Sequence, residues 1–341
     1  MPLRTGLIGY GLAGRSFHAP LIAATPGLEL ASVVTGDPGR AAEARRSHPG
    51  VRIEPDAESL FARAGEHDLI VVASPNTAHA ELAGRAIEAG LAVVVDKPLA
   101  PTAAEARALV DKAKAARVPL TVFHNRRWDS DQLTLRRLIG AGELGDVLRY
   151  ESRFERWRPQ RRAGAWRMET PPERGGGLLL DLGTHLVDQA LVLFGPVRSV
   201  YGEVEHRRGG PADDDAFVAL EHESGVHSHL WASELAAAPG PRLRVLGSAG
   251  AFTVEALDSQ EDALRAGARP GGAERWGVEP ESRWGRLRRG DANETVQPER
   301  GDWPRFYSEL VAALTSGAEL PVDPSDAVAV LEILERARAG R

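Results

Sequence analysis

The sequence predicts an α/β fold with two domains: a doubly wound parallel sheet in residues 1–123, and an α+β domain with a large open, mainly antiparallel sheet in residues 124–341. Two observations carry this prediction. Up to Phe123, short continuously apolar runs alternate with longer amphipathic stretches, as in parallel sheets that are covered on both faces by helices. After Phe123, segments with a period of two residues predominate, which is typical of antiparallel strands with one solvated face.

In the first part of the chain, strands and helices are expected to alternate. The apolar runs predict five strands, at residues 5–8, 28–35, 69–74, 92–96 and 119–123. The stretches between them carry Ala, Glu, Arg and Leu at helical spacing. They predict helices at residues 14–24, 38–47, 77–89 and 102–116.

In the second part, a helix is expected at 130–139 and another at 178–194. Alternating segments predict strands at 147–157, 197–205, 216–223, 226–234 and 242–246, with turn signals between several of them. The stretch 258–300 is rich in Gly, Pro, Arg and Glu and is expected to form loops. Two helices, at 302–316 and 324–339, are expected to close the chain, and the last of them could pack back on the N-terminal domain.

The composition excludes several classes of protein. The 341 residues are 43% hydrophobic and 26% charged, as in a soluble globular chain, and the net charge of −6 argues against nucleic acid as a partner. The chain has no cysteine, which excludes disulfides and thiolate zinc sites. No run of about 18 apolar residues predicts a membrane span, and no targeting signal precedes the first predicted strand, so we expect a cytoplasmic protein with no membrane partner.

A glycine-rich turn joins the first predicted strand to the first predicted helix. Its G-x-G-x-x-G pattern consists of Gly9, Tyr10, Gly11, Leu12, Ala13 and Gly14. Glycines in this context permit a tight turn and the close approach of a pyrophosphate, toward which the helix start directs its N–H groups. We therefore interpret the first domain as a Rossmann domain that binds a nicotinamide dinucleotide; an ordinary glycine turn is the alternative.

The end of the second predicted strand bears on the choice of cofactor. Asp37 is placed to bind the adenosine ribose of NAD. A pocket for the 2′-phosphate of NADP would instead be formed by Thr35, Gly36 and Arg40. Asp37 also directly precedes a proline at a helix start, so capping that helix is an alternative role. We favour NADP and keep NAD as the alternative.

Three further polar clusters follow later parallel strands. Ligands bind beyond the carboxyl ends of the strands in an open α/β sheet, so the clusters are expected to meet at one crevice. Lys97 would lie near the nicotinamide and polarise a substrate oxygen, although a solvated lysine at a strand end is the alternative. The clusters are Ser74, Pro75 and Asn76; Asp96, Lys97 and Pro98; and His124, Asn125 and Arg126.

A second constellation lies on the helix predicted at 178–194. Asp181, His185 and Asp188 have i, i+4 and i+7 spacing and therefore share one helix face. A carboxylate one turn away can fix the tautomer of a histidine, and histidine suits proton transfer near neutral pH. A buried structural histidine and a metal site are the alternatives. The sequence groups few partners for a metal, and none is expected.

Other residues have weaker assignments. Trp157 and Trp166 flank the basic stretch 158–162 and could wall a sugar site or belong to the core. His18 is expected on the first helix with an open role. A half-exposed sheet surface is expected for His222, His227 and His229, and a solvated turn for Asp213, Asp214 and Asp215.

These motifs together resemble the glucose–fructose oxidoreductase/inositol dehydrogenase (Gfo/Idh/MocA) family over essentially the whole chain. The matching stretches are GLIGYGLAG (6–14), FHAPLI (17–22), SPNTAH (74–79), VVDKPL (94–99), FHNRRWDSD (123–131) and DLGTH (181–185). Residues 124–131 and 260–267 are most similar to a branch of NADP-dependent scyllo-inositol dehydrogenases. Asp96 is a departure, since most of the family has glutamate before the lysine, but this branch often has aspartate.

The resemblance implies a role for each group of residues. The catalytic residues would be Lys97, Asp181 and His185. The pyrophosphate would contact the turn from Gly9 to Gly14, and the ribose and nicotinamide side would be lined by Ser74, Pro75, Asn76 and His79, next to Asp96 and Pro98. Asn125 would stand at the entrance to the substrate site. Apart from the resemblance, we also predict that Arg126 and Trp166 contact the substrate beside Asp181 and His185.

The predicted activity is hydride transfer between NAD(P) and a secondary alcohol or ketone of a cyclic polyol or sugar, such as an inositol. His185 would act as general base, oriented by Asp181, while Lys97 stabilises charge on the reacting oxygen. A non-catalytic sensor that binds NADP(H) is the alternative from another class. Because an open sheet needs cover, we also expect a homodimer or higher homo-oligomer that forms through the C-terminal sheet.

Overall fold

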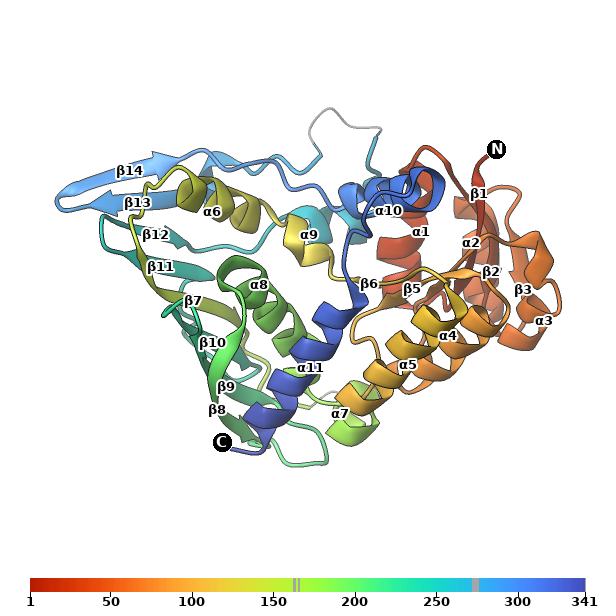
Figure 1. Cartoon of the computed structure of the whole chain (residues 1–341), viewed down its shortest axis with the longest axis horizontal. Coiled ribbons are helices and arrows are strands. Elements are labelled where there is room, and N and C mark those ends of the chain that lie inside the picture. Colours follow the sequence, from red (N-terminus) through yellow and green to blue (C-terminus); the bar gives the residue numbers. More distant parts are fainter. Residues whose placement is uncertain (162–163, 165, 272–275, 341) are drawn as a thin grey trace. The chain divides into compact units, whose positions relative to one another are not determined.

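The computed structural model describes residues 1–161, 164, 166–271 and 276–340, and the chain forms two compact units (Figure 1). The first unit comprises Met1–Asn125, Gln260–Trp276 and Asp302–Val328, and the second comprises Arg126–Ser259, Gly277–Gly301 and Ala329–Arg341. This division differs from the expected single boundary after residue 123, because two later segments join the first unit. Aromatic packing explains why the segment Asp302–Val328 joins the first unit. The ring centroids of Phe306 and Tyr307 lie 4.9 and 5.9 Å from that of Phe123.

The first unit contains a six-stranded parallel sheet with the strand order β3-β2-β1-β4-β5-β6. Its strands are β1 (Leu3–Ile8), β2 (Leu28–Val34), β3 (Arg52–Glu54), β4 (Leu69–Val72), β5 (Ala92–Asp96) and β6 (Leu120–Phe123). Strands β2 and β3 lie on one side of β1, and β4, β5 and β6 lie on its other side. The predicted doubly wound sheet is therefore confirmed. The carboxyl ends of β1 and β4 flank the switch point at which such sheets bind ligands.

Most helices of the first unit lie where the sequence predicts them, and α3 and α9 are additional. They are α1 (Ala19–Ala24), α2 (Pro38–Ser47), α3 (Ala57–Phe61), α4 (His79–Glu88), α5 (Ala103–Ala116), α9 (Gln260–Arg265) and α10 (Pro304–Ser316). Helix α1 is preceded by a π-turn, η1 (Gly14–His18), and α10 packs against α1. The sequence pattern did not predict β3 and α3, because three and five residues are too few to show a period.

The second unit contains an eight-stranded sheet with the order β14-β13-β12-β11-β7-β10-β9-β8. Its strands are β7 (Val147–Glu155), β8 (Val197–Glu205), β9 (Asp215–His222), β10 (His227–Ser233), β11 (Leu243–Gly247), β12 (Ala251–Val254), β13 (Gly285–Arg289) and β14 (Ala292–Val296). Strands β7 and β10 pair in parallel and the other neighbours pair antiparallel, so the mainly antiparallel sheet is confirmed.

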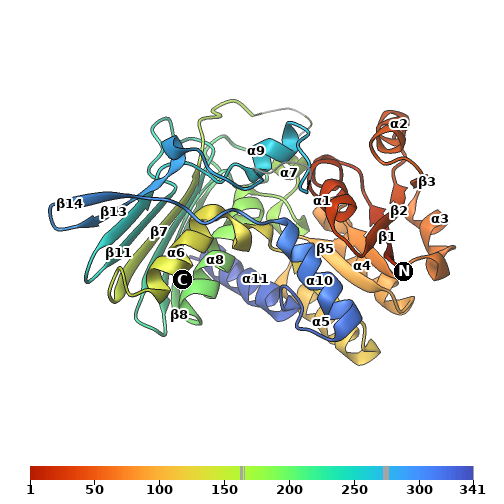
Figure 2. The same ribbon diagram turned by 90° about the horizontal axis from the view of Figure 1, so that it is seen from above.

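One face of this sheet is covered by helices. Helices α6 (Ser130–Gly140) and α8 (Thr184–Phe194) lie on the same side of it, and no helix of the described residues covers the other side (Figure 2). A short helix, α7 (Trp166–Glu169), precedes the glycine run at 175–177. Helix α11 (Pro324–Arg338) begins in the first unit, and its end packs on β8, where a Cβ on Gly202 would lie 2.2 Å from the Ala337 oxygen.

The expectation of loops throughout 258–300 is wrong for the described residues, because α9, β13 and β14 lie within this stretch. Strand β13 buries Gly285 and Leu287 while its arginines Arg286 and Arg288 stay exposed. The exposed positions of β13 are charged, and these charges hide the apolar alternation from an argument based on composition. Residues 272–275 lie outside the described part of the chain, as does Arg162 of the predicted basic stretch.

His222 is also placed differently from the prediction. Strand β9 alternates between buried and half-buried residues, and His222 falls on the buried face with no exposed surface. Its Nδ1 lies 2.8 Å from the Gly195 oxygen and its Nε2 lies 2.8 Å from Ser228 Oγ. His222 is therefore a core residue with both ring nitrogens satisfied, whereas His229 is half-buried and His227 exposed.

None of the helices in the described ranges is both long enough and apolar enough to cross a membrane.

Candidate active site

The glycine-rich turn after β1 divides its glycines between two tasks. Gly9 has φ +102°, and a Cβ there would lie 2.5 Å from the Ala73 oxygen. A Cβ on Gly14 would lie 2.0 Å from the Gly9 oxygen. Gly11 differs, since a Cβ there would meet no other part of the described chain within 4 Å. The first and third glycines are thus required by packing, and the middle one leaves the backbone open to a ligand, which fits a bound pyrophosphate.

The other residues of the turn anchor it. Tyr10 is 2% exposed, and its ring lies edge-on to His48 with centroids 6.5 Å apart. Burial raises the pKa of the Tyr10 hydroxyl. Leu12 is 44% exposed and Ala13 is half-buried, so among these three residues Tyr10 is the one that anchors the turn in the core. Recognition of a dinucleotide by the N–H groups of the turn stays a prediction.

At the end of β2, Asp37 caps the next helix. Its Oδ1 accepts a hydrogen bond from the Arg40 N–H at 2.8 Å, and Pro38 follows it at the first position of α2. Thr35 Oγ1 accepts the Asp37 N–H at 3.3 Å. Gly36 and Arg40 are exposed, so a cationic side chain is available at this strand end beside the capping carboxylate.

His79 ties two strand-end loops together. It is 1% exposed, with Nδ1 2.7 Å from the Pro98 oxygen and Nε2 3.0 Å from the Ser74 oxygen. Of the two residues that follow Ser74, Pro75 is exposed and Asn76 is buried. His79 therefore holds the loop after β4 to the loop after β5, which carries Lys97. The role at the ribose and nicotinamide side that the family resemblance implies for it stays a prediction.

Lys97 follows β5 and is half-buried. The side chain of Asp96 is 14% exposed, and its Oδ1 accepts the Lys97 N–H at 2.9 Å. Burial by itself raises the pKa of Asp96, but the facing His18 ring and the charges of Lys97 and His79 outweigh it, so the net shift is downward. The carboxylate thus stays ionised next to the lysine at the carboxyl edge of the sheet.

In the second unit, a glycine run leads into a helix that begins with a π-turn, η6 (Leu179–Gly183). Gly177 has φ +95°, and a Cβ there would lie 2.2 Å from Asp213 Oδ1. Asp213 Oδ2 accepts the Leu179 N–H at 2.6 Å, and its backbone oxygen accepts the Leu178 N–H at 3.0 Å. A buried carboxylate therefore satisfies the start of this helix.

The expectation of a solvated turn is wrong for Asp213 and Asp214, which have no exposed surface. Asp214 accepts backbone hydrogen bonds from Arg207 and Arg208 at 2.8 and 2.9 Å, and a side-chain bond from Arg208 at 3.0 Å. The acidic run is hydrophilic in sequence, and its partners include Leu179, 34 positions away, and Arg338, 125 positions away. No local pattern reveals such a buried cap.

Asp181 and His185 occupy the π-turn and the first turn of α8, respectively. The Asp181 side chain is 27% exposed, with Oδ1 3.5 Å from Arg167 Nε. His185 is 6% exposed, and its ring centroid lies 6.2 Å from that of Phe154. The expected continuous helix is therefore interrupted at the predicted site, and π-turns are frequent at functional sites.

Asp188, the third member of the predicted face, is held by an arginine. Arg127 Nε lies 3.1 and 2.9 Å from its two carboxylate oxygens, and Arg127 Nη2 lies 2.5 Å from Oδ1. The side chain of Asp188 is 3% exposed. This bidentate ion pair anchors α8 to the segment before α6 and leaves Asp181 as the carboxylate of the proposed pair.

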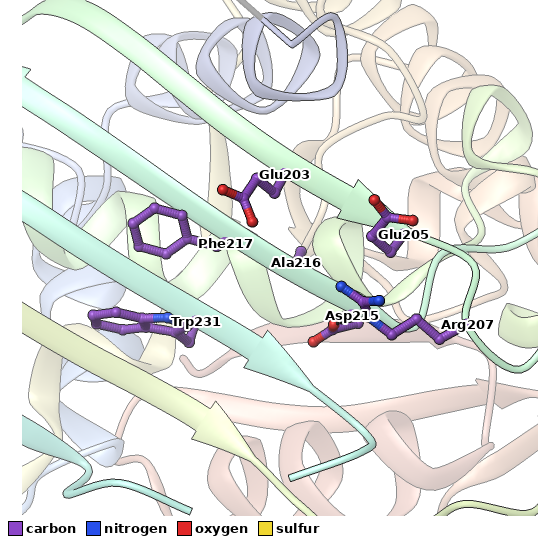
Figure 3. A pocket seen from close by; sticks show the side chains of 7 residues that line it. All are labelled: Glu203, Glu205, Arg207, Asp215, Ala216, Phe217 and Trp231. Carbon is purple, nitrogen blue, oxygen red and sulfur yellow. Dashed lines mark hydrogen bonds and ion pairs between the residues drawn. The ribbon is translucent and has the colours of Figure 1, made fainter.

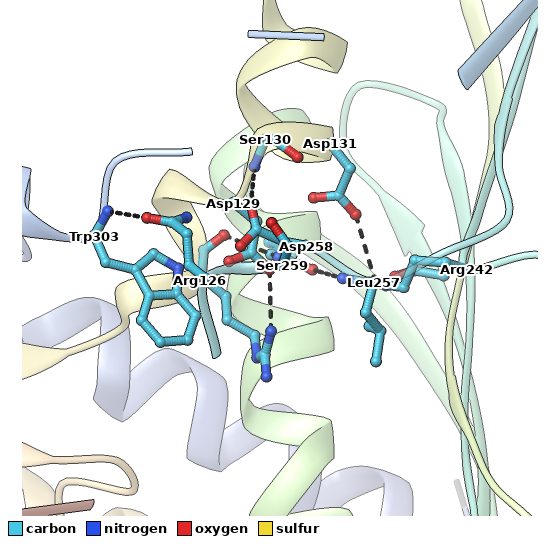
Figure 4. Close-up of polar contacts among 12 residues, drawn as sticks. Arg126, Asp129, Ser130, Asp131, Arg242, Leu257, Asp258, Ser259 and Trp303 are labelled. Atoms are coloured by element: carbon cyan, nitrogen blue, oxygen red, sulfur yellow. Dashed lines mark hydrogen bonds and ion pairs between the residues drawn. The ribbon is translucent and has the colours of Figure 1, made fainter. Parts of the chain in front are cut away.

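The residues predicted on the substrate side are more buried than a binding surface suggests. Arg126 is 7% exposed, with Nη1 3.2 Å from Asp129 Oδ2 and its guanidinium 5.0 Å from the Phe154 ring centroid (Figure 4). Asn125 is 6% exposed. Trp166 is half-buried, with the Arg167 guanidinium 4.6 Å from its ring centroid. Direct contact of these residues with a substrate stays a prediction.

The predicted catalytic residues belong to different units. Lys97 and the glycine-rich turn lie in the first unit, and Asp181 and His185 lie in the second. Their meeting in one cleft stays a prediction. Within the described ranges, no three His, Asp or Glu side chains gather as a metal site.

Comparisons with known proteins agree with this architecture. Residues 3–124 match the oxidoreductase family with an NAD-binding Rossmann fold, and residues 132–253 match the GFO/IDH/MocA C-terminal domain. The uncharacterized oxidoreductase YdgJ of Escherichia coli is 41% identical, over 98% of this chain and 94% of its own length. The scyllo-inositol 2-dehydrogenase (NADP(+)) IolW of Bacillus subtilis is 33% identical, over 98% of this chain and 92% of its own length.

Among solved structures, the protein yvaA from Bacillus subtilis superposes with a TM-score of 0.91 at 31% identity, over 100% of this chain and 96% of the other. Both domain matches, their order and the full-length relatives agree with the two sheets described above. The chain therefore belongs to the NAD(P)-binding Gfo/Idh/MocA family of oxidoreductases.

Proposed function

We propose that this oxidoreductase acts on a secondary alcohol, and in reverse on the ketone, of a cyclic polyol or sugar of the inositol kind. The observation that carries the proposal is Lys97, which lies at the carboxyl edge of the dinucleotide-binding sheet beside an ionised Asp96. An ammonium group there can donate a hydrogen bond to an oxygen on which negative charge develops. The relative IolW, whose name states a scyllo-inositol dehydrogenase, supports the polyol class.

In the proposed mechanism, His185 removes the proton of the substrate hydroxyl as a general base. Asp181 orients the imidazole and stabilises the imidazolium that results. Lys97 donates a hydrogen bond to the reacting oxygen while its negative charge is greatest. When bound, the nicotinamide supplies the hydride chemistry. The backbone around Gly11 would hold the pyrophosphate, because its outer side is open.

For the cofactor, we propose a preference for NADP over NAD. The Asp37 carboxylate already accepts the Arg40 N–H as a helix cap, and the Arg40 side chain is exposed at the same strand end. A guanidinium can bind a 2′-phosphate through two hydrogen bonds. IolW carries NADP(+) in its name. We also propose that the protein is cytoplasmic.

The test is an assay of nicotinamide absorbance with scyllo-inositol, myo-inositol, other cyclic polyols and keto-sugars, each with NADP and with NAD. We expect turnover of at least one cyclic polyol with a higher kcat/KM for NADP. Tight NADPH binding without turnover of any compound in the panel would indicate the sensor instead. Higher kcat/KM for NAD would overturn the cofactor preference alone.

We further propose that two copies pair through the outer face of the eight-stranded sheet. Phe217, His229 and Trp231 form an aromatic patch there, with the Phe217 and Trp231 ring centroids 5.0 Å apart. The patch adjoins a hollow of about 250 Å³ that is also lined by Glu203, Glu205 and Arg207 (Figure 3). The face therefore carries apolar rings and both signs of charge, as a self-complementary two-fold interface requires.

The oligomer is tested by light scattering at micromolar concentration. The wild-type protein is expected to be a dimer or a higher oligomer, and Trp231→Glu is expected to shift it toward the monomer. Val278→Glu provides a matched control, because Val278 is 48% exposed in a segment outside the sheet strands. A wild-type monomer would refute the interface.

A further inference from the structure

His18 is a buried polar residue that the proposed mechanism does not use. It ends the π-turn η1 that follows the glycine-rich turn, and it has no exposed surface. Its Nδ1 lies 2.6 Å from the hydroxyl of Tyr307, a residue 289 positions away on α10 that is also fully buried. Buried polar groups are costly unless they are hydrogen-bonded, so a long-range pair of this kind needs a structural or functional reason.

The other side of the imidazole faces the site. His18 Nε2 lies 3.9 Å from Asp96 Oδ1, the same oxygen that accepts the Lys97 N–H. The ring is fixed laterally by Phe123, with centroids 4.4 Å apart. The polar groups thus run in line from the Tyr307 hydroxyl through the His18 ring to the Asp96 carboxylate and the backbone of Lys97.

The direction of the hydrogen bonds follows from the chemistry of the groups. Burial, and then the negative charge of Asp96, raise the pKa of Tyr307 well above its ordinary value, so the phenol keeps its proton. A protonated phenol that donates to Nδ1 leaves the imidazole proton on Nε2. That N–H then faces the ionised Asp96 carboxylate from 3.9 Å, an electrostatic contact that is longer than a hydrogen bond. The other charged groups around Asp96 are Lys97 and His79.

We propose that His18 and Tyr307 are positioning residues for Lys97. Tyr307 selects the tautomer of His18, His18 holds the Asp96 carboxylate in place, and Asp96 fixes the turn from which the lysine side chain projects. The inference rests on the proposed function insofar as Lys97 donates a hydrogen bond to the reacting oxygen. It extends that function to two residues that lie outside the cofactor and substrate motifs.

The sharpest variant is Tyr307→Phe, which removes one hydroxyl and keeps a ring that packs against Phe123 and Phe306. With scyllo-inositol and NADP, we expect kcat to fall about tenfold, the scale of one lost hydrogen bond to a buried group. The dissociation constant of NADPH, measured by fluorescence, should change less than about twofold on the same scale. A substitution that only loosened the fold would impair both.

A pair of His18 variants tests the donor to Asp96. The amide of His18→Gln can reach the place of Nε2 and donate to Asp96, whereas His18→Leu has no donor. We expect His18→Gln to retain several times the kcat of His18→Leu. His67→Gln is the matched control, because His67 is 4% exposed and lies 2.6 Å from Ser32 Oγ but precedes β4, at the opposite end of the strands. It should lower stability and leave kcat unchanged.

A second measurement does not depend on any substrate. The chain contains three lysines, Lys97, Lys112 and Lys114, so acylation of each can be followed by mass spectrometry with the two on α5 as internal references. We expect Lys97 of Tyr307→Phe to react about threefold faster than in the wild type, with Lys112 and Lys114 unchanged.

The two measurements separate failure of this inference from failure of the proposed function. Equal labelling of Lys97 in all variants, or an unchanged kcat in Tyr307→Phe, would overturn the positioning role. Altered labelling of Lys97 in a protein that turns over no polyol would leave the positioning role standing and remove the proposed substrate class.

Discussion

Each unit contains a glycine-rich turn that leads into a helix beginning with a π-turn. The two turns differ in what lies next to their glycines. In the first turn, no atom of the described residues, apart from the chain neighbours of Gly11, lies within 4 Å of where its Cβ would be. In the second, a Cβ on Gly176 would lie 1.7 Å from the Thr170 oxygen, and one on Gly177 would lie 2.2 Å from Asp213 Oδ1. The first turn opens its backbone to a ligand, whereas the second is closed by packing.

The difference shows how each unit contributes chemistry. In the proposed function, the first unit binds a dinucleotide mainly through the backbone of its glycine-rich turn and supplies Lys97 from the loop after β5. The second unit packs its glycines against Thr170 and Asp213 at the start of a helix, and that helix carries Asp181 and His185, the proposed catalytic side chains. A glycine in a motif therefore indicates a ligand only where the space that a Cβ would occupy is free of protein atoms.

The largest expected effect tests the side chain of the first unit. Lys97→Ala should lower kcat by about 10²–10³-fold, because a donor aimed at a developing negative charge contributes on that scale. The dissociation constant of NADPH, measured by fluorescence titration, should change much less. Lys112→Ala is the matched control, since Lys112 is exposed on α5 and paired with Glu88. Full activity of Lys97→Ala would remove the lysine from the mechanism.

The second prediction tests the side chain of the other unit. His185→Ala should lower kcat by about 10²-fold or more, the usual contribution of a general base. Cofactor affinity should be little changed, because the glycine-rich turn lies in the first unit. His227→Ala, at an exposed position on β10, should keep wild-type kcat. Unchanged turnover in His185→Ala would mean that another residue accepts the proton.

The third prediction tests the glycines themselves. Gly14→Ala and Gly177→Ala should each lower the free energy of unfolding by about 3 kcal/mol, because the new methyl group would collide with the backbone or with Asp213. Gly11→Ala should change it by less than about 0.5 kcal/mol. It should instead weaken NADPH binding by about tenfold, as expected where a pyrophosphate approaches the backbone.

Urea unfolding and fluorescence titration of these three variants would decide between the two roles. A stable Gly177→Ala protein, or a Gly11→Ala protein that binds NADPH with wild-type affinity, would erase the distinction between the closed and the open turn.

The smallest expected effect concerns a feature that the two units share. His67 and His222 each pair one ring nitrogen with a serine hydroxyl and the other with a backbone oxygen. Burial lowers the pKa of both histidines below the ordinary value. Between the folded and unfolded pKa values the unfolded chain binds more protons, so stability is full above about pH 7 and declines as the pH falls below about 6.5.

Thermal unfolding at several pH values checks this expectation. His222→Gln should be less stable than the wild type at neutral pH and should lose less stability on acidification. A wild-type melting temperature that rises from pH 7 to pH 5.5 would contradict the assigned direction of the shifts.

The sequence by itself determined whatever depends on near neighbours. Apolar runs and helical spacing located β1, β2, β4, β5 and β6, and the G-x-G-x-x-G pattern located the turn whose glycines the structure shows to be required or open. These features are local, because strand burial, helix amphipathicity and a positive φ depend on residues that are close in the chain. The family resemblance rests on the same short motifs.

Only the tertiary structure decided which distant groups meet. It joined His18 to Tyr307 across 289 positions, placed Asp213 at the start of a helix 34 positions away, and paired Arg127 with Asp188. It also formed β13 and β14 from a stretch too rich in arginine to suggest strands. Buried polar groups take whichever partner the folded chain brings within hydrogen-bond distance, and no local pattern in the sequence encodes that choice.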